Sequence, residues 1–224
     1  MGKMISFPRT NGQKAQGYLA EAKDVKAAGV VVIQEWWGLQ GQIKEVCDRL
    51  AGEGFNALAP DLYSGKVVPY HDSAAAAAAM NELDFKAATS EAVRGAVKHL
   101  KASGGKVGLT GFCMGGAVTV IGAVHIPELS AAVCFYGIPP ESAASPKDVR
   151  VPFQGHFAKQ DDWCTPAVVD AFEKGLKDSG QPFELYRYEG HHAFMNSDRK
   201  EVYSAEAAKT AWERCLRFLR QHLA

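Results

Sequence analysis

The sequence predicts an α/β fold in which a doubly wound, mainly parallel sheet is flanked by helices. Short apolar runs alternate with longer segments of helical period along the chain, and this alternation is typical of a parallel sheet. The run Val30-Val31-Val32-Ile33 is apolar at every position, as expected of a strand covered on both faces. No linker, repeat or shift of composition divides the 224 residues, a length that fits one domain. We therefore expect a single domain over residues 1–224.

Each element of the alternation follows from a local pattern. After the strand at 30–33, a helix is expected at 42–53, because Gly52 and Gly54 end its apolar stripe. A strand at 56–59 precedes Pro60, and an Ala-rich region at 73–102 predicts one or two helices, since Ala is the best helix former. The remaining elements are expected as strands at 106–110, 131–136, 151–156 and 183–188 and as helices at 117–124, 166–178 and 202–223.

Charge and composition exclude several classes of partner. The 25 Lys and Arg residues balance 25 Asp and Glu residues, and no basic stripe or acidic tail favours a nucleic acid or an anionic membrane. The N-terminus lacks an apolar signal segment, and no apolar run reaches the roughly 18–20 residues that span a bilayer. We expect a cytoplasmic protein. No heptad pattern indicates an interface, so a monomer is expected.

The five cysteines do not form a disulfide or metal pattern. Cys47, Cys134 and Cys215 lie in apolar stripes and are expected to be buried, whereas the environment of Cys164 is left open. The adjacent His191 and His192 would point their side chains apart, and no HExxH motif is present, so neither a metal nor another cofactor is expected.

The segment Gly111-Phe112-Cys113-Met114-Gly115-Gly116 has the pattern of a nucleophile elbow, with cysteine where serine usually stands. An apolar strand precedes it and a helical run follows it. Glycines two positions before and after Cys113 allow the strand and the helix to approach closely. A helix N-terminus favours negative charge, and the thiolate is the reactive form of cysteine. The pattern predicts that Cys113 is a nucleophile; the alternative is a buried cysteine in a tight turn.

A base and an acid are expected downstream of this elbow. In α/β-hydrolase sites the chain order is nucleophile, acid, histidine. The pair Asp161-Asp162 follows one predicted strand, and the pair His191-His192 follows the next. Because parallel strands end at the same edge of a sheet, an aspartate and a histidine from these pairs are expected near Cys113.

The chain resembles the dienelactone hydrolase family (carboxymethylenebutenolidases), compact α/β-hydrolases with a cysteine nucleophile. The resemblance covers nearly the whole chain, and its main carriers are Gln34-Glu35-Trp36-Trp37-Gly38, Ala59-Pro60-Asp61-Leu62-Tyr63, Gly108 to Gly116, Phe135-Tyr136-Gly137, His156-Phe157 and Gly190-His191-His192-Ala193-Phe194. It implies a single-domain α/β-hydrolase fold and hydrolysis of a small ester or lactone through a thioester, without a cofactor.

The resemblance also assigns roles to residues. The family's Asp-x-x-Val-Pro pattern is similar to the segment from Asp162 to Pro166, and its His-x-Phe pattern matches His192-Ala193-Phe194, which selects Asp162 and His192 for the triad. It implies that Glu35 contacts the Cys113 thiol and assists its deprotonation. The backbone N–H groups of Trp36 and Met114 are expected to form the oxyanion hole.

The resemblance weakens at the substrate pocket. Well-known members hold a substrate carboxylate with arginines, but residues 64–92 contain no arginine, and Met195-Asn196 follow the histidine motif. Lys66, Lys86 and Arg199 are possible substitutes. Aromatic residues are instead expected to line the pocket, namely Trp37, Phe112, Trp163 and Tyr136. Turnover of dienelactone itself is therefore left open.

Two other interpretations remain. The chain could be a non-hydrolytic family member that acts as a redox-responsive or small-molecule-binding protein through Cys113. A dinucleotide-binding protein is disfavoured, because Gly108, Gly111 and Gly115 do not have the G-x-G-x-x-G spacing.

Overall fold

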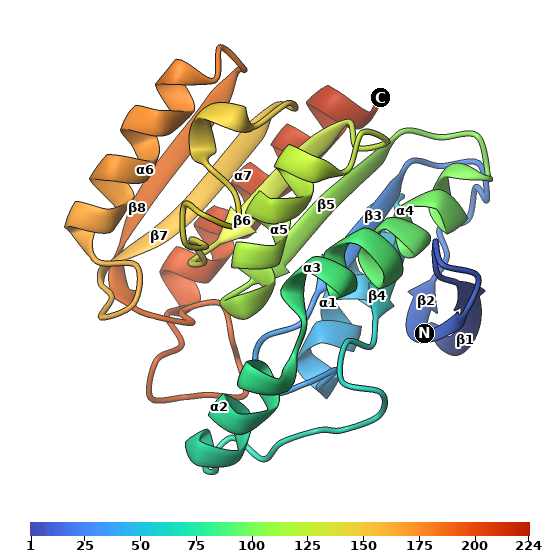
Figure 1. Cartoon of the computed structure of the whole chain (residues 1–224), viewed down its shortest axis with the longest axis horizontal. Coiled ribbons are helices and arrows are strands. Elements are labelled where there is room, and N and C mark those ends of the chain that lie inside the picture. The colour runs from blue at the N-terminus through green and yellow to red at the C-terminus, as the bar shows by residue number, and fades with distance from the viewer.

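The computed structural model describes residues 1–224 and is built on one eight-stranded sheet (Figure 1). The strand order is β1-β2-β4-β3-β5-β6-β7-β8. The strands are β1 (Lys3–Pro8), β2 (Lys14–Ala20), β3 (Gly29–Ile33), β4 (Asn56–Pro60), β5 (Val107–Phe112), β6 (Ala131–Phe135), β7 (Phe153–Gln160) and β8 (Phe183–His191). The pairs β1–β2 and β2–β4 are antiparallel. Every other pair of neighbouring strands in this order is parallel. The predicted α/β fold with a mainly parallel sheet is confirmed.

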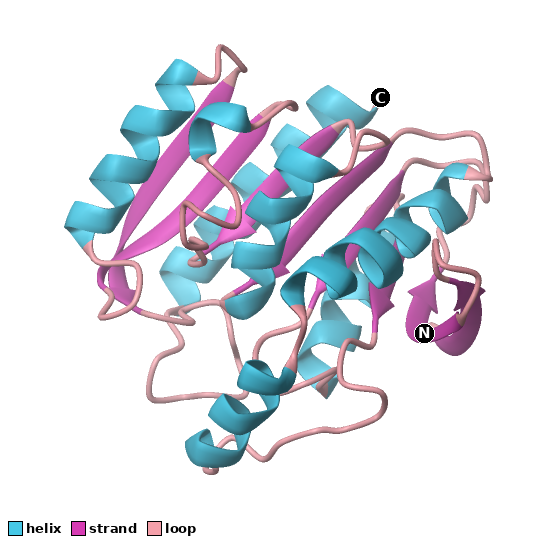
Figure 2. Ribbon diagram, in the orientation of Figure 1, coloured by secondary structure: helices cyan, strands magenta, loops and turns pink.

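Helices cover both faces of this sheet (Figure 2). The helical segments are α1 (Gly41–Gly52), α2 (Ser73–Glu82), α3 (Phe85–Ala87), the π-helical turn η1 (Ala88–Val93), α4 (Arg94–Lys101), α5 (Met114–His125), the 3₁₀ turn η2 (Pro146–Asp148), α6 (Pro166–Asp178) and α7 (Ala205–Leu223). One core cluster packs α4, α5 and α6 on the sheet, and a second packs α1 and α7 on the opposite face. Every residue of β3 is buried, as its uniformly apolar sequence predicts.

The Ala-rich region at 73–102 is divided more finely than the sequence predicts. α2 ends near Leu83, and the side chain of Asp84 accepts a hydrogen bond from the N–H of Ala87 at 2.9 Å, which starts the next helical segment. α2 lies beyond the edge of the sheet in Figure 1. Its residues Ala76 and Ala79 pack against Trp37 in a small separate cluster. The small side chains of this helix therefore cover the loop that follows β3.

The fold brings the loops that carry the expected catalytic residues to one edge of the sheet. β5 lies in the middle, between β3 and β6, and α5 begins directly after it. Because β3, β5, β6, β7 and β8 run parallel, the residues that follow their carboxyl ends meet at this edge.

Three of the cysteines behave as predicted. Cys47, Cys134 and Cys215 are buried, and all five cysteines are free thiols. Cys164, whose environment the sequence left open, is also buried. None of the helices combines the length and apolar character needed to cross a bilayer.

Candidate active site

Cys113 stands at a strained corner between β5 and α5. Its backbone has φ 55° and ψ −118°, a region that non-glycine residues rarely occupy. A Cβ atom on Gly115 would lie 2.5 Å from the carbonyl oxygens of Ile33 and Gln34, so this position has no room for a side chain. The N–H of Cys113 donates to the carbonyl of Phe135 at 3.0 Å, which ties the corner to the neighbouring strand. The strand, turn and helix therefore have the geometry predicted for a nucleophile elbow.

His192 and Asp161 meet above the ends of β7 and β8. The Nδ1 atom of His192 lies 2.8 Å from Oδ2 of Asp161. The other oxygen of Asp161 accepts hydrogen bonds from the N–H groups of Trp163 at 2.8 Å and Cys164 at 2.9 Å. The Asp161 side chain is buried and makes three hydrogen bonds within the protein, which fix its position.

The expectation that Asp162 would pair with His192 is corrected by this geometry. Asp162 is exposed, whereas its neighbour Asp161 is buried against the histidine. The reason is local: the turn after β7 folds back on the Asp161 side chain, which directs the next side chain outward.

His192 and Asp161 each stabilise the charged form of the other. Burial opposes the charged form of His192, but the nearby Cys113 thiolate and the hydrogen bond to Asp161 raise the pKa of His192 from its usual 6.5 to about 10. Burial likewise opposes the charge of Asp161, yet the bonds from His192, Cys164 and Trp163 lower the pKa of Asp161. The second ring nitrogen of His192, Nε2, is buried and has no hydrogen-bond partner. The arrangement can hold an imidazolium beside a thiolate.

Glu35 follows β3 and is buried at the same edge. Its carboxylate accepts hydrogen bonds from the Tyr136 hydroxyl at 3.3 Å and from Nδ2 of Asn196 at 2.7 Å. Burial raises the pKa of Glu35, against the opposing effects of the Asn196 hydrogen bond and of the charges on His192 and Arg199. Neither oxygen accepts a hydrogen bond from Cys113, so the expected contact with the thiol is not made in this conformation.

The two backbone amides expected in the oxyanion hole are free. Met114 is the first residue of α5, so its N–H has no carbonyl one turn earlier in the helix to bond. The N–H of Trp36 donates to no group of the protein. Both follow the carboxyl ends of central strands, where a substrate carbonyl near Cys113 could reach them.

Of the four side chains expected to bind substrate, only Trp163 is exposed. Its relative exposure is 62%, and its ring centre lies 6.4 Å from that of His192. Tyr136 and Trp37 are buried: the first places its ring 5.1 Å from His192, and the second packs in the loop after β3. The expectation for Phe112 is wrong, because its ring is fully buried on the α1 and α7 face. Successive side chains of a strand point to opposite faces, so proximity to Cys113 in sequence does not place Phe112 in the site.

Sequence reasoning gave no role to two residues of this site. Tyr63, half-buried, directs its hydroxyl to Sδ of Met114 at 3.2 Å, and burial together with the charge of Cys113 raises the pKa of Tyr63. Asn196 is fully buried against Glu35. The sequence did not indicate this role, because Asn196 stands where well-known members of the family carry an arginine.

Of the cations suggested as substitutes for the missing arginines, Arg199 is engaged within the protein, whereas the two lysines form no ion pair. Arg199 donates to Glu201 at 2.9 Å and lies 5.6 Å from the Trp37 ring centre. Lys66 and Lys86 are exposed. No group of three or more His, Cys, Asp and Glu side chains comes together in a way that could hold a metal ion.

The model of the dienelactone hydrolase family matches residues 15–223. The chain belongs to the dienelactone hydrolase family. This family member is 36% identical over 232 residues to Protein usf of Aquifex pyrophilus, and the alignment covers all of both chains. It is 34% identical over 236 residues, again with full coverage of both chains, to a protein of Aquifex aeolicus (strain VF5) named "Putative carboxymethylenebutenolidase".

A solved structure agrees with the family. The crystal structure of a protein named "Putative Dienelactone Hydrolase", from Klebsiella pneumoniae subsp. pneumoniae MGH 78578, superposes with a TM-score of 0.87 at 28% identity, covering 99% of this chain and 98% of that one. This member of the dienelactone hydrolase family thus has the α/β-hydrolase fold, and it is a carboxylic ester hydrolase.

Proposed function

We propose that this chain hydrolyses a small ester or lactone through a thioester on Cys113, with His192 and Asp161 completing the triad. The observation that carries the proposal is the arrangement at the strand ends: a cysteine at a strained elbow, whose charge acts on a histidine that is held by a buried aspartate. These are the parts that nucleophilic acyl transfer requires.

The first half of the reaction forms the thioester. The substrate carbonyl oxygen accepts hydrogen bonds from the amides of Met114 and Trp36 while the Cys113 thiolate attacks the carbonyl carbon. The tetrahedral intermediate then collapses, the C–O bond to the leaving group breaks, and His192 donates its proton to the departing alkoxide. With a pKa of about 10, His192 holds that proton at neutral pH. In a lactone the alkoxide stays tethered to the acyl group.

The second half returns the enzyme to its starting state. Neutral His192 accepts a proton from water, which attacks the thioester carbonyl, and the C–S bond breaks to release the carboxylic acid and the thiolate. Asp161 keeps the imidazole in the tautomer whose Nε2 faces the reacting groups.

Glu35 belongs to this proposal as a buried carboxylate that acts on the charges of the pair. An ionised carboxylate near a thiol disfavours the thiolate, whereas it favours the imidazolium of His192. Because Tyr136 and Asn196 hold Glu35, a substrate that breaks those bonds would change both effects at once.

The proposed substrates are uncharged at the part that lies near Trp163. No arginine stands where well-known members hold the substrate carboxylate, and Arg199 is paired with Glu201. The exposed Trp163 ring offers an apolar surface beside His192. We therefore expect uncharged esters and lactones to be turned over in preference to a carboxylate-bearing dienelactone.

The test compares wild type, Cys113→Ala and Cys113→Ser on p-nitrophenyl acetate and on dienelactone. Wild type is expected to hydrolyse the acetate, and Cys113→Ala is expected to lose on the order of 10³-fold or more in kcat/KM. Acid quenching of the wild-type reaction, followed by mass spectrometry, should find the acetyl group on the peptide that contains Cys113. Wild-type rates in the alanine variant, or no turnover of either substrate by wild type, would remove the basis of the proposal.

A further inference from the structure

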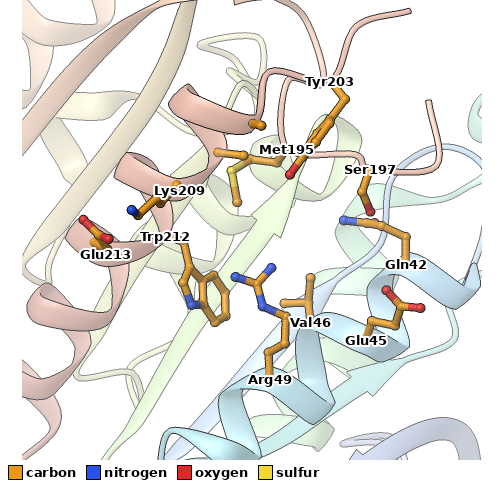
Figure 3. A pocket seen from close by; sticks show the side chains of 12 residues that line it. Gln42, Glu45, Val46, Arg49, Met195, Ser197, Tyr203, Lys209, Trp212 and Glu213 are labelled. Carbon is orange, nitrogen blue, oxygen red and sulfur yellow. The ribbon is translucent and has the colours of Figure 1, made fainter. Parts of the chain in front are cut away.

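A pocket with a volume of about 270 Å³ lies between α1 and α7, and no proposed catalytic residue lines it (Figure 3). The loop at 193–204, which follows His192, closes one side through Met195, Ser197 and Tyr203. Drug-sized ligands usually occupy pockets of roughly 300–1,000 Å³, so this one suits a smaller molecule.

The exposed side chain of Arg49 brings into this pocket a guanidinium that forms no ion pair. Figure 3 shows Arg49 near the centre, next to Trp212, and its guanidinium carbon lies 3.9 Å from the centre of that ring. Arg49 takes part in none of the ion pairs or side-chain hydrogen bonds of the protein, although such a group has five donors in a planar fork. Partial desolvation lowers the pKa of Arg49, against the opposing charges of Glu53 and Glu45, neither of which forms an ion pair with the guanidinium.

A second polar group that lines the pocket also lacks a partner. Gln42 has a relative exposure of 5%, and its Oε1 atom is buried without a hydrogen bond. Figure 3 shows its amide end pointing from α1 toward the pocket, near Ser197. A buried amide that makes no bond to the protein is unusual, because its desolvation is uncompensated. The amide oxygen can only accept a hydrogen bond, but the N–H groups of Nε2, which also make no bond to the protein, can donate to a molecule in the pocket.

The rim decides which anion fits. Lys209 and Glu213 lie on one side of the pocket and Glu45 on the other, and none of them forms an ion pair within the protein (Figure 3). Because the rim carries two carboxylates and only one ammonium group, it repels a dianion such as phosphate more strongly than a monoanion. A carboxylate also matches the planar fork of a single arginine with two parallel hydrogen bonds.

We propose that the pocket between α1 and α7 binds a small organic carboxylate, held by the guanidinium of Arg49 and the amide of Gln42. Ester hydrolysis releases a molecule of this class, and only that link to a reaction product rests on the proposed function. The pocket shares a wall with the catalytic site: Asn196, which donates to Glu35, stands in the loop between Met195 and Ser197.

The test is a calorimetric titration of the full chain with sodium butyrate and with butyramide, which has the same shape and no charge. Butyrate is expected to bind at least tenfold more tightly than butyramide. Arg49→Met should weaken butyrate binding by tenfold or more. Arg217→Met should bind as wild type does, since Arg217 is an exposed arginine of α7 that pairs with Glu184 outside the pocket.

Two further variants make the result decisive. Arg49→Lys keeps the positive charge next to Trp212 but removes the fork, so it should fold and still bind butyrate several-fold more weakly than wild type. Cys113→Ala should bind butyrate as wild type does, whether or not the chain hydrolyses esters. No binding of butyrate up to about 10 mM, or equal binding by wild type and both Arg49 variants, would overturn the proposal.

Discussion

Asp161 and Asp162 are chemically identical neighbours that lie in opposite environments. Asp161 accepts three hydrogen bonds, one of them from His192 at 2.8 Å, whereas Asp162 faces solvent. Asp161→Asn is expected to reduce kcat/KM by about 10²–10⁴-fold, the usual contribution of general acid–base catalysis, because the amide no longer stabilises the imidazolium. Asp162→Asn should stay within about twofold of wild type. The opposite ranking in a steady-state ester assay would return the triad role to Asp162.

This pair shows where prediction of the site from the sequence ends. The positions of Cys113 and His192 could be predicted, because an elbow pattern and a strand end fix where each residue lies relative to the sheet. Which of two adjacent aspartates points inward depends on hydrogen bonds within the turn, to the N–H groups of Trp163 and Cys164. Family spacing pointed to the wrong neighbour because it counts residues and not turn geometry.

The protonation of His192 is expected to depend on Cys113. Burial alone would lower the pKa of His192, and the Cys113 thiolate is the largest of the effects that raise it to about 10. Cys113→Ala should therefore lower the pKa of His192. An NMR titration of the imidazole protons measures this, with His156 as an internal reference, since its ring is buried elsewhere. An unchanged His192 titration in the variant would show that the thiolate and imidazolium do not interact.

At the scale of elements, the elbow depends on glycines that let α5 approach β3. A Cβ on Gly115 would lie 2.5 Å from two backbone oxygens, which cannot move without displacing β3. Gly115→Ala is expected to destabilise the fold by about 1–3 kcal/mol or more and to reduce activity, because the corner at Cys113 shifts. Gly52→Ala is the matched control: it lies in a helix with nothing within 4 Å of the added Cβ, and should be neutral or slightly stabilising. Urea unfolding with equal m-values measures both, and equal stability of the two variants would contradict the close approach.

The elements that could be predicted are those covered on both faces or clearly amphipathic. The helix at Pro166–Asp178 has the bounds predicted, and the strands from β3 to β8 were all expected. The hairpin of β1 and β2 was not, because β1 buries only Phe7 and its other residues give little alternation. In the Ala-rich region the hydrophobic periodicity did not indicate where a helix ends, since Ala suits every face of a helix. The break lies where the side chain of Asp84 caps a new helical segment.

The whole molecule should respond to acid through a neutral histidine inside its sheet. His156 is fully buried in β7, where its ring stacks on Phe135 at 4.6 Å. Its nitrogens lie 2.8 Å from the Tyr188 hydroxyl and 2.8 Å from Oε1 of Gln154. Burial, with a smaller effect of the charge on Arg214, lowers the pKa of His156 from its usual 6.5 to about 3. Protonation is thus strongly resisted in the folded state and free in the unfolded chain.

The sign of the effect follows from proton counts. Between pH 6.5 and about 3 the unfolded chain holds one more proton at His156 than the folded chain does, so the free energy of unfolding falls as pH falls. The slope is about 1.4 kcal/mol per pH unit from this residue. His192 acts in a different window: because its pKa is raised to about 10, its contribution is fully present below pH 6.5 and is lost as pH rises through 10. Glu35, whose pKa burial raises, acts in the opposite direction to His156 as pH falls.

Comparison with a variant isolates the contribution of His156. Urea unfolding of wild type should show that the free energy of unfolding decreases as the pH is lowered from 6.5 to 5. This range lies above the usual pKa values of most carboxylates. His156→Gln can still hydrogen-bond but cannot titrate, so it should be less stable at pH 7 and its slope should be shallower by about 1 kcal/mol per pH unit. Effects of His192 and Glu35 are common to both proteins and cancel in the difference. Parallel pH profiles for wild type and His156→Gln would mean that the folded protein accepts a proton at this ring as readily as the unfolded chain does.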